Sequence, residues 1–266
     1  MHNFLILLLL AVVQGVTEFL PISSSGHLSL MYSIFNISHS NLFLTIVLHL
    51  ATLVSVCVYY RKDIYMLITH PLCSTNKKII ISTICTLIFA IPMYSVVENF
   101  MSANYLIFTF GITAIILVIA DYLSNTTYNL SNIYSVYDTI TNINISYKQA
   151  ILIGLTQGIA VIPGVSRSGS TIATALITRV DKHNATKYSF LISIPIIIGS
   201  GVLQVIDILK GNAVIPYNLV EILVAFVVCF IVGILAIKLC DKVVNKSKLY
   251  MFSYYLILIV IILLIT

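Results

Sequence analysis

The sequence predicts an all-α polytopic membrane protein built as an inverted-topology repeat. Each half is expected to contain one re-entrant helical hairpin and three transmembrane helices. Three observations predict this fold class: an apolar composition, two broken apolar regions that resemble each other, and a one-sided distribution of basic residues.

The composition excludes most soluble classes of protein. Of the 266 residues, 59% are hydrophobic and 9% are charged, and the mean hydropathy is +1.06. A soluble domain carries about 25% charged residues, so this chain has too few polar side chains to cover a surface in water. A soluble enzyme, a disordered protein and a nucleic-acid-binding protein are therefore not expected, although the net charge is +5. Residues 1–266 are expected to form a single integral-membrane domain.

Six uninterrupted apolar stretches predict full transmembrane helices, because about 20 apolar residues are needed to cross a bilayer. These stretches lie at about 42–60, 79–97, 104–121, 187–209, 218–238 and 249–265.

Two further apolar regions, about 4–35 and 149–179, are interrupted near their middle. Pro21 and a cluster of serines break the first, and Pro163 with Gly164 breaks the second. Each region is too short for two spans and too broken for one, because Pro and Gly end helices. Each is therefore expected to form a re-entrant hairpin of two half-length helices. Irregular backbone at membrane depth is tolerated only where it is buried in protein or lines a wet cavity, so both hairpins point to a functional site.

The two hairpins also resemble each other in sequence. A Gln-Gly pair followed by Pro-x-x-Ser occurs at 14–24 and, one residue shorter, at 157–166. A hairpin followed by three spans makes an odd number of crossings, so the second copy is expected to be inverted relative to the first. Repeat 1 would cover about 1–121, a linker about 122–147, and repeat 2 about 148–266.

The basic residues predict the orientation of the chain. If the N-terminus lies outside, all but two of the fourteen Lys and Arg residues fall in cytoplasmic segments; Lys210 lies outside and Arg167 within a hairpin. Positive charges concentrate on the cytoplasmic side of membrane proteins. Both termini are therefore expected outside, with the first hairpin entering from the outer face and the second from the cytoplasm, so that the two tips meet.

Glu18 is the residue that packing explains least well, because a carboxylate deep in an apolar helix costs about 2.5–3.5 kcal/mol on insertion scales. Gln14 precedes it by one helical turn, so both side chains lie on one face. The pair could stabilise helix packing. We favour a site for Mg²⁺ or Ca²⁺, in which Glu18 and Gln14 supply oxygen ligands and water and phosphate complete the shell.

The segment from Ser23 to His27 contains three serines, a glycine and a histidine. Its serines could cap the following helix, or aim backbone N–H groups at an anion. Ser24 and His27 lie three residues apart and can share a helix face, so they could act as a nucleophile and a proton-transfer group. A buried histidine is more often structural, so the catalytic interpretation of this pair depends on the presence of Glu18 nearby.

The tip of the second hairpin carries the more specific signal. Arg167 is the only basic residue predicted at membrane depth, and a guanidinium matches phosphate oxygens. The alternative is an ion pair between Arg167 and Glu18 that holds the two repeats together. We favour an anion site, because small residues with hydrogen-bond donors surround Arg167. The residues expected to line this site with it are Ser23, Gly164, Ser166, Ser168 and Thr171.

The two tips together resemble the two signature motifs of the undecaprenyl-diphosphate phosphatase family, the bacitracin-resistance type. The motifs are Gln14-Gly-Val-Thr-Glu-Phe-Leu-Pro-Ile-Ser-Ser-Ser-Gly-His27 and Pro163-Gly-Val-Ser-Arg-Ser-Gly-Ser-Thr171, and the resemblance extends over nearly the whole chain. It implies hydrolysis of undecaprenyl diphosphate to its monophosphate, dependent on Mg²⁺ or Ca²⁺, in the bacterial cytoplasmic (inner) membrane. This reaction recycles the lipid carrier for peptidoglycan synthesis.

The resemblance also implies a role for individual residues. Glu18 would be the essential acidic residue, Ser24 the proposed nucleophile and His27 its acid/base partner. The sequence leaves open whether Ser24 or a water activated by His27 attacks the terminal phosphorus. Arg167 would bind the diphosphate with the help of Ser166 and Thr171. Position 14 is acidic in many family members and is Gln here, which lowers the local negative charge.

One alternative function remains open from the sequence. A transporter or flippase of a phosphorylated lipid could use the same inverted repeats, although transport does not require the group formed by Glu18, Ser24 and His27. His49 lies within an apolar span and is expected to pack against a neighbouring helix. The bilayer and the lipid substrate are the expected partners, nucleic acid is not, and a homodimer is one alternative for the oligomeric state.

Overall fold

The computed structural model describes residues 2–35, 42–93, 102–128, 143–210 and 217–265. Every regular element in these ranges is an α-helix, which confirms the predicted all-α fold. The helices are α1 (His2–Thr17), α2 (Ser24–Ile34), α3 (Leu42–Tyr59), α4 (Arg61–Thr69), α5 (Ser74–Met93), α6 (Ala103–Tyr128), α7 (Tyr147–Ile159), α8 (Arg167–Ile177), α9 (Lys182–Lys210), α10 (Leu219–Asn245) and α11 (Tyr250–Ile265).

Several of these helices can cross a membrane. Among the described residues, α5, α6, α9 and α10 are long and apolar enough to do so, and α3 with α4 makes a fifth candidate bent by 80°. Helix α11 occupies the last predicted span but has only 16 residues, fewer than the typical 20. These helices make the protein a multi-pass membrane protein.

Several predicted boundaries differ from the structure. Helices α5 and α9 begin at Ser74 and Lys182 rather than near 79 and 187, and α10 ends at Asn245 rather than near 238. Helix α6 continues to Tyr128, so the first residues of the predicted linker at 122–147 are helical rather than irregular. Residues 129–142 of that linker lie outside the described residues, as does the end of the span predicted at 79–97.

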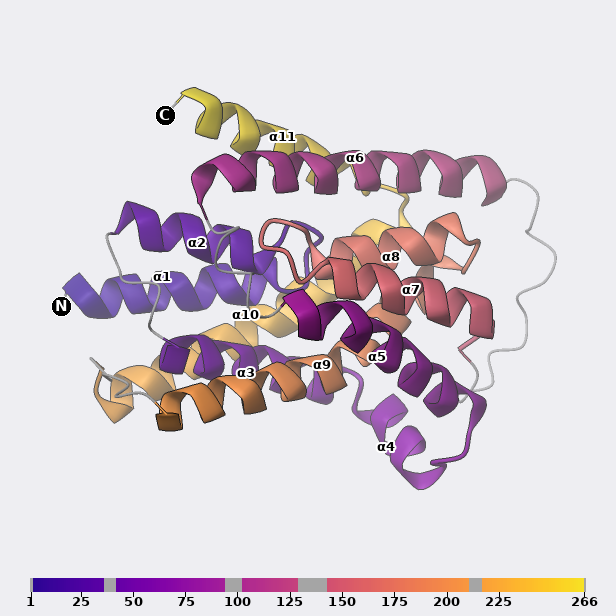
Figure 1. The fold of residues 1–266 in the computed structure, drawn as a ribbon, viewed down its shortest axis with the longest axis horizontal. Coiled ribbons are helices and arrows are strands. Elements are labelled where there is room, and N and C mark those ends of the chain that lie inside the picture. Colours follow the sequence, from indigo (N-terminus) through magenta and orange to yellow (C-terminus); the bar gives the residue numbers. More distant parts are fainter. Residues whose placement is uncertain (1, 36–41, 94–101, 129–142, 211–216, 266) are drawn as a thin grey trace.

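The two broken apolar regions each fold into a pair of short helices joined by a tight loop. Figure 1 shows α1 and α2 reaching the centre from the end where both termini lie, and α7 and α8 reaching it from the opposite end. The predicted pairs of half-length helices are therefore present, and their re-entrant course in a membrane stays a prediction. The symmetry between the two halves, and the repeat boundaries near 121 and 148, stay predictions.

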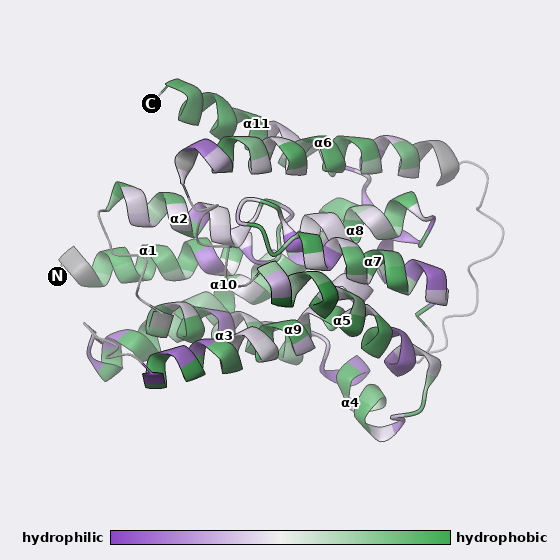
Figure 2. Ribbon diagram, viewed as in Figure 1, coloured by the Kyte–Doolittle hydropathy of each residue, from purple (hydrophilic) through white to green (hydrophobic). Residues whose placement is uncertain are grey.

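Direct contacts hold the two hairpin tips together. Ser168 Oγ donates a hydrogen bond of 3.1 Å to the carbonyl oxygen of Leu20. Gly26 faces the other loop so closely that a Cβ there would lie 3.0 Å from the Cα of Gly164. Figure 2 shows hydrophilic positions interrupting the mostly hydrophobic helices where these hairpins converge. The polar part of the interior thus lies at the junction of the tips.

The loop before α8 depends on Gly164. Its φ of +86° lies in the left-handed region that favours glycine, and a Cβ there would lie 2.8 Å from the Cβ of Thr109. Its carbonyl oxygen accepts a 3.0 Å hydrogen bond from Thr113 Oγ1. This turn places Ser166, which is the N-cap of α8, and Arg167 at the centre of the molecule.

Helices α5 and α7 pack in direct backbone contact at Gly154. A Cβ at this position would lie 2.7 Å from the Cα of Ser82 and 2.9 Å from the Cβ of Cys85. Gly154→Ala is therefore expected to force the two helices apart and to destabilise the protein by about 1–3 kcal/mol. Thermal denaturation of the purified protein in detergent measures the effect as a lower melting temperature.

Gly111→Ala is the matched control, because among the described residues no atom outside its own stretch of helix lies within 4 Å of the position of its Cβ, and alanine favours a helix. Its melting temperature should equal or exceed that of the wild type. Equal melting temperatures for Gly154→Ala and Gly111→Ala would contradict the proposed close packing.

Candidate active site

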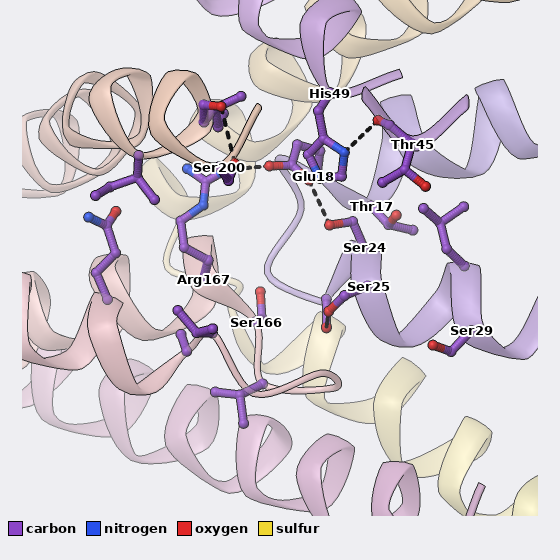
Figure 3. Close-up of a pocket in the computed structure, with 18 of the residues that line it drawn as sticks. Thr17, Glu18, Ser24, Ser25, Ser29, Thr45, His49, Ser166, Arg167 and Ser200 are labelled. Carbon is purple, nitrogen blue, oxygen red and sulfur yellow. Dashed lines mark hydrogen bonds and ion pairs between the residues drawn. The ribbon is translucent and has the colours of Figure 1, made fainter. Parts of the chain in front are cut away.

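A cavity of about 720 Å³ lies at the junction of the hairpin tips. Its walls come from both tips and from α2, α3 and α9. Figure 3 shows the side chains of Glu18, Ser24, Arg167 and His49 gathered in it. The rest of the wall is mixed: it carries apolar side chains, among them Leu28, Val161, Val165, Ile196 and Ile197, and polar ones, among them Ser29, Thr45, Gln157, Ser200 and Gln204. The cavity therefore combines the charged group at the tips with a wall of apolar and polar side chains.

Glu18 and Arg167 form an ion pair across the two tips. The side chains are 6% and 16% exposed, and Arg167 Nη2 donates to Glu18 Oε1. The structure thus contains the ion pair that the sequence offered as the alternative to an anion site. Arg167 Nη1, however, is buried and has no hydrogen-bond partner among the described residues. Because an unpaired charged donor is costly in a buried site, this atom is suited to receive an anionic ligand.

The other oxygen of Glu18 organises the first tip. Ser24 Oγ donates a hydrogen bond of 2.6 Å to Glu18 Oε2, and Gln14 Nε2 donates one of 3.0 Å to the same oxygen. Ser24 follows the N-cap residue of α2, Ser23, and lies at the edge of the cavity. A hydroxyl that donates to a carboxylate has the arrangement of an activated nucleophile with its base.

His27 lies at the same tip but is fully engaged with the protein. Its Nδ1 lies 2.7 Å from the carbonyl oxygen of Ser23, its Nε2 lies 2.8 Å from the hydroxyl of Tyr255, and its ring stacks on Tyr255. It does not belong to the cavity wall. These contacts suit a residue that positions the loop, while its proton-transfer role stays a prediction. Sequence reasoning missed Tyr255, which lies more than 200 residues away on α11.

The structure places His49 differently from the helix packing that the sequence predicted. His49 lines the cavity with a side chain that is 27% exposed, and its Nε2 lies 4.0 Å from Glu18 Oε2. One feature of the sequence could have predicted a role for His49 in the site: it is an ionisable residue in the middle of an apolar span, and such residues in a membrane are functional by default.

The remaining predicted residues divide into two groups. Ser23 and Ser166 line the cavity. Ser168 and Thr171 are buried, and Thr171 Oγ1 lies 2.5 Å from Ser189 Oγ and donates to the carbonyl of Arg167. The structure therefore brings together Glu18, Ser23, Ser24, Ser166 and Arg167. It places Gln14, His27, Gly164, Ser168 and Thr171 behind the wall, where they support these residues.

The residues near Glu18 fit a hard divalent cation that shares its coordination shell with a ligand. Gln14 Oε1 is buried and has no hydrogen-bond partner in the described part of the chain. Rotation of this amide, whose Nε2 donates to Glu18 Oε2, would place that oxygen beside the carboxylate. The described residues contain no cluster of three or more His, Cys, Asp or Glu side chains that could hold a metal ion. Mg²⁺ commonly binds through one or two protein oxygens with water and substrate phosphates supplying the rest.

Known proteins resemble this chain along almost its whole length. Residues 7–262 match the family described as "Bacitracin resistance protein BacA". A protein named undecaprenyl-diphosphatase from Thermosipho africanus (strain TCF52B) is 38% identical over 262 residues, which cover 96% of this chain and 97% of that protein. A protein of the same name from Carboxydothermus hydrogenoformans is 35% identical over 250 residues, which cover 93% and 91%. The match confirms the resemblance carried by the two tip motifs, and the chain belongs to the BacA family.

Proposed function

We propose that the protein hydrolyses undecaprenyl diphosphate to undecaprenyl phosphate and inorganic phosphate. The names of its relatives support this reaction. The observation that carries the proposal is the convergence of Ser24, Glu18 and Arg167 on one cavity. These three residues supply a nucleophile, a proton acceptor and a cation whose Nη1 has no partner within the described ranges, which are the groups that phosphoryl transfer needs.

In the proposed reaction, Arg167 Nη1 and the N-terminal end of α8 bind the terminal phosphate. Ser24 Oγ attacks the terminal phosphorus while its proton passes to Glu18 Oε2. The bond between that phosphorus and the bridging oxygen breaks, so undecaprenyl phosphate leaves and Ser24 carries the phosphoryl group. Water then hydrolyses this phosphoserine. Arg167 stabilises the negative charge that develops on the phosphoryl oxygens.

We also propose that Mg²⁺ or Ca²⁺ assists the reaction. Glu18 and Gln14 would hold the ion, and its charge would neutralise the diphosphate. Chelation with EDTA is expected to lower phosphate release strongly, and adding back either ion should restore it. Unchanged activity after chelation would contradict this part of the proposal.

The apolar side chains in the cavity wall support a lipid substrate. Leu28, Ile196 and Ile197 belong to α2 and α9 and extend from the polar tips along the helices. Burial against such side chains favours an isoprenoid chain over a soluble phosphate ester. The part of the chain next to the diphosphate would contact this wall.

The bacterial cytoplasmic membrane is the proposed location, with both termini outside. Figure 1 shows both termini at the same end of the molecule. Most basic residues belong to segments that the sequence assigns to the cytoplasmic side. Recycling of the carrier lipid would supply peptidoglycan synthesis, and the family's name implies bacitracin resistance. A homodimer stays a prediction.

Release of inorganic phosphate from undecaprenyl diphosphate by the purified protein tests the proposed function. Ser24→Ala should abolish the activity, because it removes the nucleophile without disturbing the ion pair of Glu18 with Arg167. Movement of the lipid across proteoliposomes without phosphate release would instead identify a transporter. Full activity of Ser24→Ala would refute the role of Ser24.

Tyr255→Phe tests whether His27 acts by positioning the loop. The variant keeps the ring that stacks on His27 but removes the hydroxyl 2.8 Å from its Nε2. The loss of one such hydrogen bond, worth about 1 kcal/mol, should lower kcat about five-fold without changing the shape of its pH profile. Tyr254→Phe, on the adjacent and more exposed residue, is the matched control. A shifted pH profile in Tyr255→Phe would indicate that His27 transfers a proton.

A further inference from the structure

In its neutral form, the imidazole of His49 presents one nitrogen to the cavity as a hydrogen-bond acceptor. Its Nδ1 lies 2.8 Å from the backbone carbonyl oxygen of Thr45. A carbonyl oxygen can only accept, so Nδ1 carries the hydrogen and Nε2 of the neutral ring carries a lone pair. Figure 3 shows this ring beside Glu18, turned so that Nδ1 meets Thr45. The contact with Thr45 therefore fixes both the orientation and the tautomer of His49.

The distance from His49 to Glu18 suits a bridging water. Nε2 lies 4.0 Å from Glu18 Oε2, which is too long for a direct hydrogen bond. One water that donates both of its hydrogens, at about 2.8 Å each, joins two acceptors roughly 4–4.5 Å apart. The lone pairs of such a water would point away from both acceptors and toward the cavity.

Ser24 controls whether Glu18 can accept this water. A carboxylate oxygen has two good acceptor directions, and those of Oε2 are taken by the hydrogen bonds from Ser24 Oγ and Gln14 Nε2. Once Ser24 carries a phosphoryl group, its Oγ has no hydrogen to donate. One acceptor direction of Oε2 is then released, 4.0 Å from His49 Nε2.

We propose that His49 and Glu18 together hold the water that hydrolyses the phosphorylated Ser24, and that His49 is a positioning residue for this second step alone. The proposal rests on the proposed function with Ser24 as the nucleophile. Glu18 first passes the proton received from Ser24 to the departing lipid phosphate. The water oxygen then forms a bond to phosphorus, the bond from phosphorus to Ser24 Oγ breaks, and inorganic phosphate is released. One water proton passes to Glu18, which returns it to Ser24 Oγ.

The decisive variant is His49→Leu, which removes the acceptor nitrogen but keeps an apolar side chain. The probe is undecaprenyl diphosphate carrying a radioactive terminal phosphate, mixed with an excess of purified protein. Three quantities are followed with time: the undecaprenyl phosphate formed, the label on Ser24 and the phosphate released. His49→Leu should form one equivalent of undecaprenyl phosphate at the wild-type rate and retain the label on Ser24. Its phosphate release should be about 10²-fold slower.

His49→Gln is the matched variant, because its amide oxygen can accept a hydrogen bond without an imidazole. It should release phosphate within about ten-fold of the wild-type rate and accumulate little label. The rapid first turnover of His49→Leu also reports that this variant is folded. Loss of both steps in His49→Leu without label on Ser24, or equal losses in both variants, would overturn the proposal. Failure of the wild type to form undecaprenyl phosphate would instead refute the proposed function itself.

Discussion

Arg167→Lys is expected to lower kcat/KM for undecaprenyl diphosphate about 10²- to 10³-fold while the protein stays folded. Lysine keeps the positive charge, so the buried carboxylate of Glu18 remains paired and the tips remain joined. The substitution removes Nη1, the guanidinium nitrogen that has no hydrogen-bond partner among the described residues. A lysine ammonium also cannot form the two parallel hydrogen bonds to phosphate oxygens that a planar guanidinium forms.

Arg167→Ala is a less informative variant, because it leaves Glu18 buried without its cation. Removing one partner of a buried ion pair destabilises a protein by about 3–5 kcal/mol, so loss of activity could follow from loss of fold. Arg179→Lys is the matched control, since Arg179 is exposed and lies beyond the other end of α8. Initial rates over a range of substrate concentrations, with melting temperatures of all three variants, make the comparison. Wild-type kcat/KM in Arg167→Lys would show that Nη1 binds no phosphate.

The hairpins and the central charges could be predicted because each breaks a local rule. Pro, Gly and Ser in the middle of an apolar run forbid a continuous helix. A carboxylate at position 18 and a guanidinium at position 167 are too costly at membrane depth to be incidental. Neither inference needs to know which helices pack together, so both could be made from the sequence.

The partners of the two histidines could not be predicted in this way. Three residues of helix turn through about 300°, which leaves about 60° between the directions of Ser24 and His27. That difference is enough for Ser24 to reach Glu18 while His27 reaches Tyr255. The position of His49 beside Glu18 depends on how α3 is rotated against α1, which local sequence does not encode.

The ends of helices were harder to predict than their existence. Residues 122–128 are rich in Asn, Ser and Thr, which favours a linker because these side chains compete for backbone hydrogen bonds. Helix α6 nevertheless continues through them. Its buried residues Ala120, Asp121 and Ser124 show that packing continues there, and packing outweighs the weak local preference.

Glu18→Gln is expected to reduce phosphate release at least about 10³-fold, because one side chain serves three neighbours. The amide cannot take the proton of Ser24 and removes the counter-charge of Arg167. If the amide nitrogen replaces Oε2, it would also face Gln14 Nε2, so that two donors meet. Glu221→Gln is the matched control, since the capping box of α10 can accept either Glu or Gln.

Adding Gln14→Glu to Glu18→Gln separates the charge of the site from its geometry. The double variant restores one carboxylate a helical turn away, at a buried position that lies outside the cavity wall. It should recover part of the melting temperature lost in Glu18→Gln, because Arg167 regains a nearby negative charge. Phosphate release should stay low, since Ser24 Oγ donates its hydrogen bond to the side chain at position 18 rather than to that at position 14. Recovery of activity together with stability would show that the site needs only a negative charge near Arg167, and that the 2.6 Å hydrogen bond from Ser24 to Glu18 is not what activates the nucleophile.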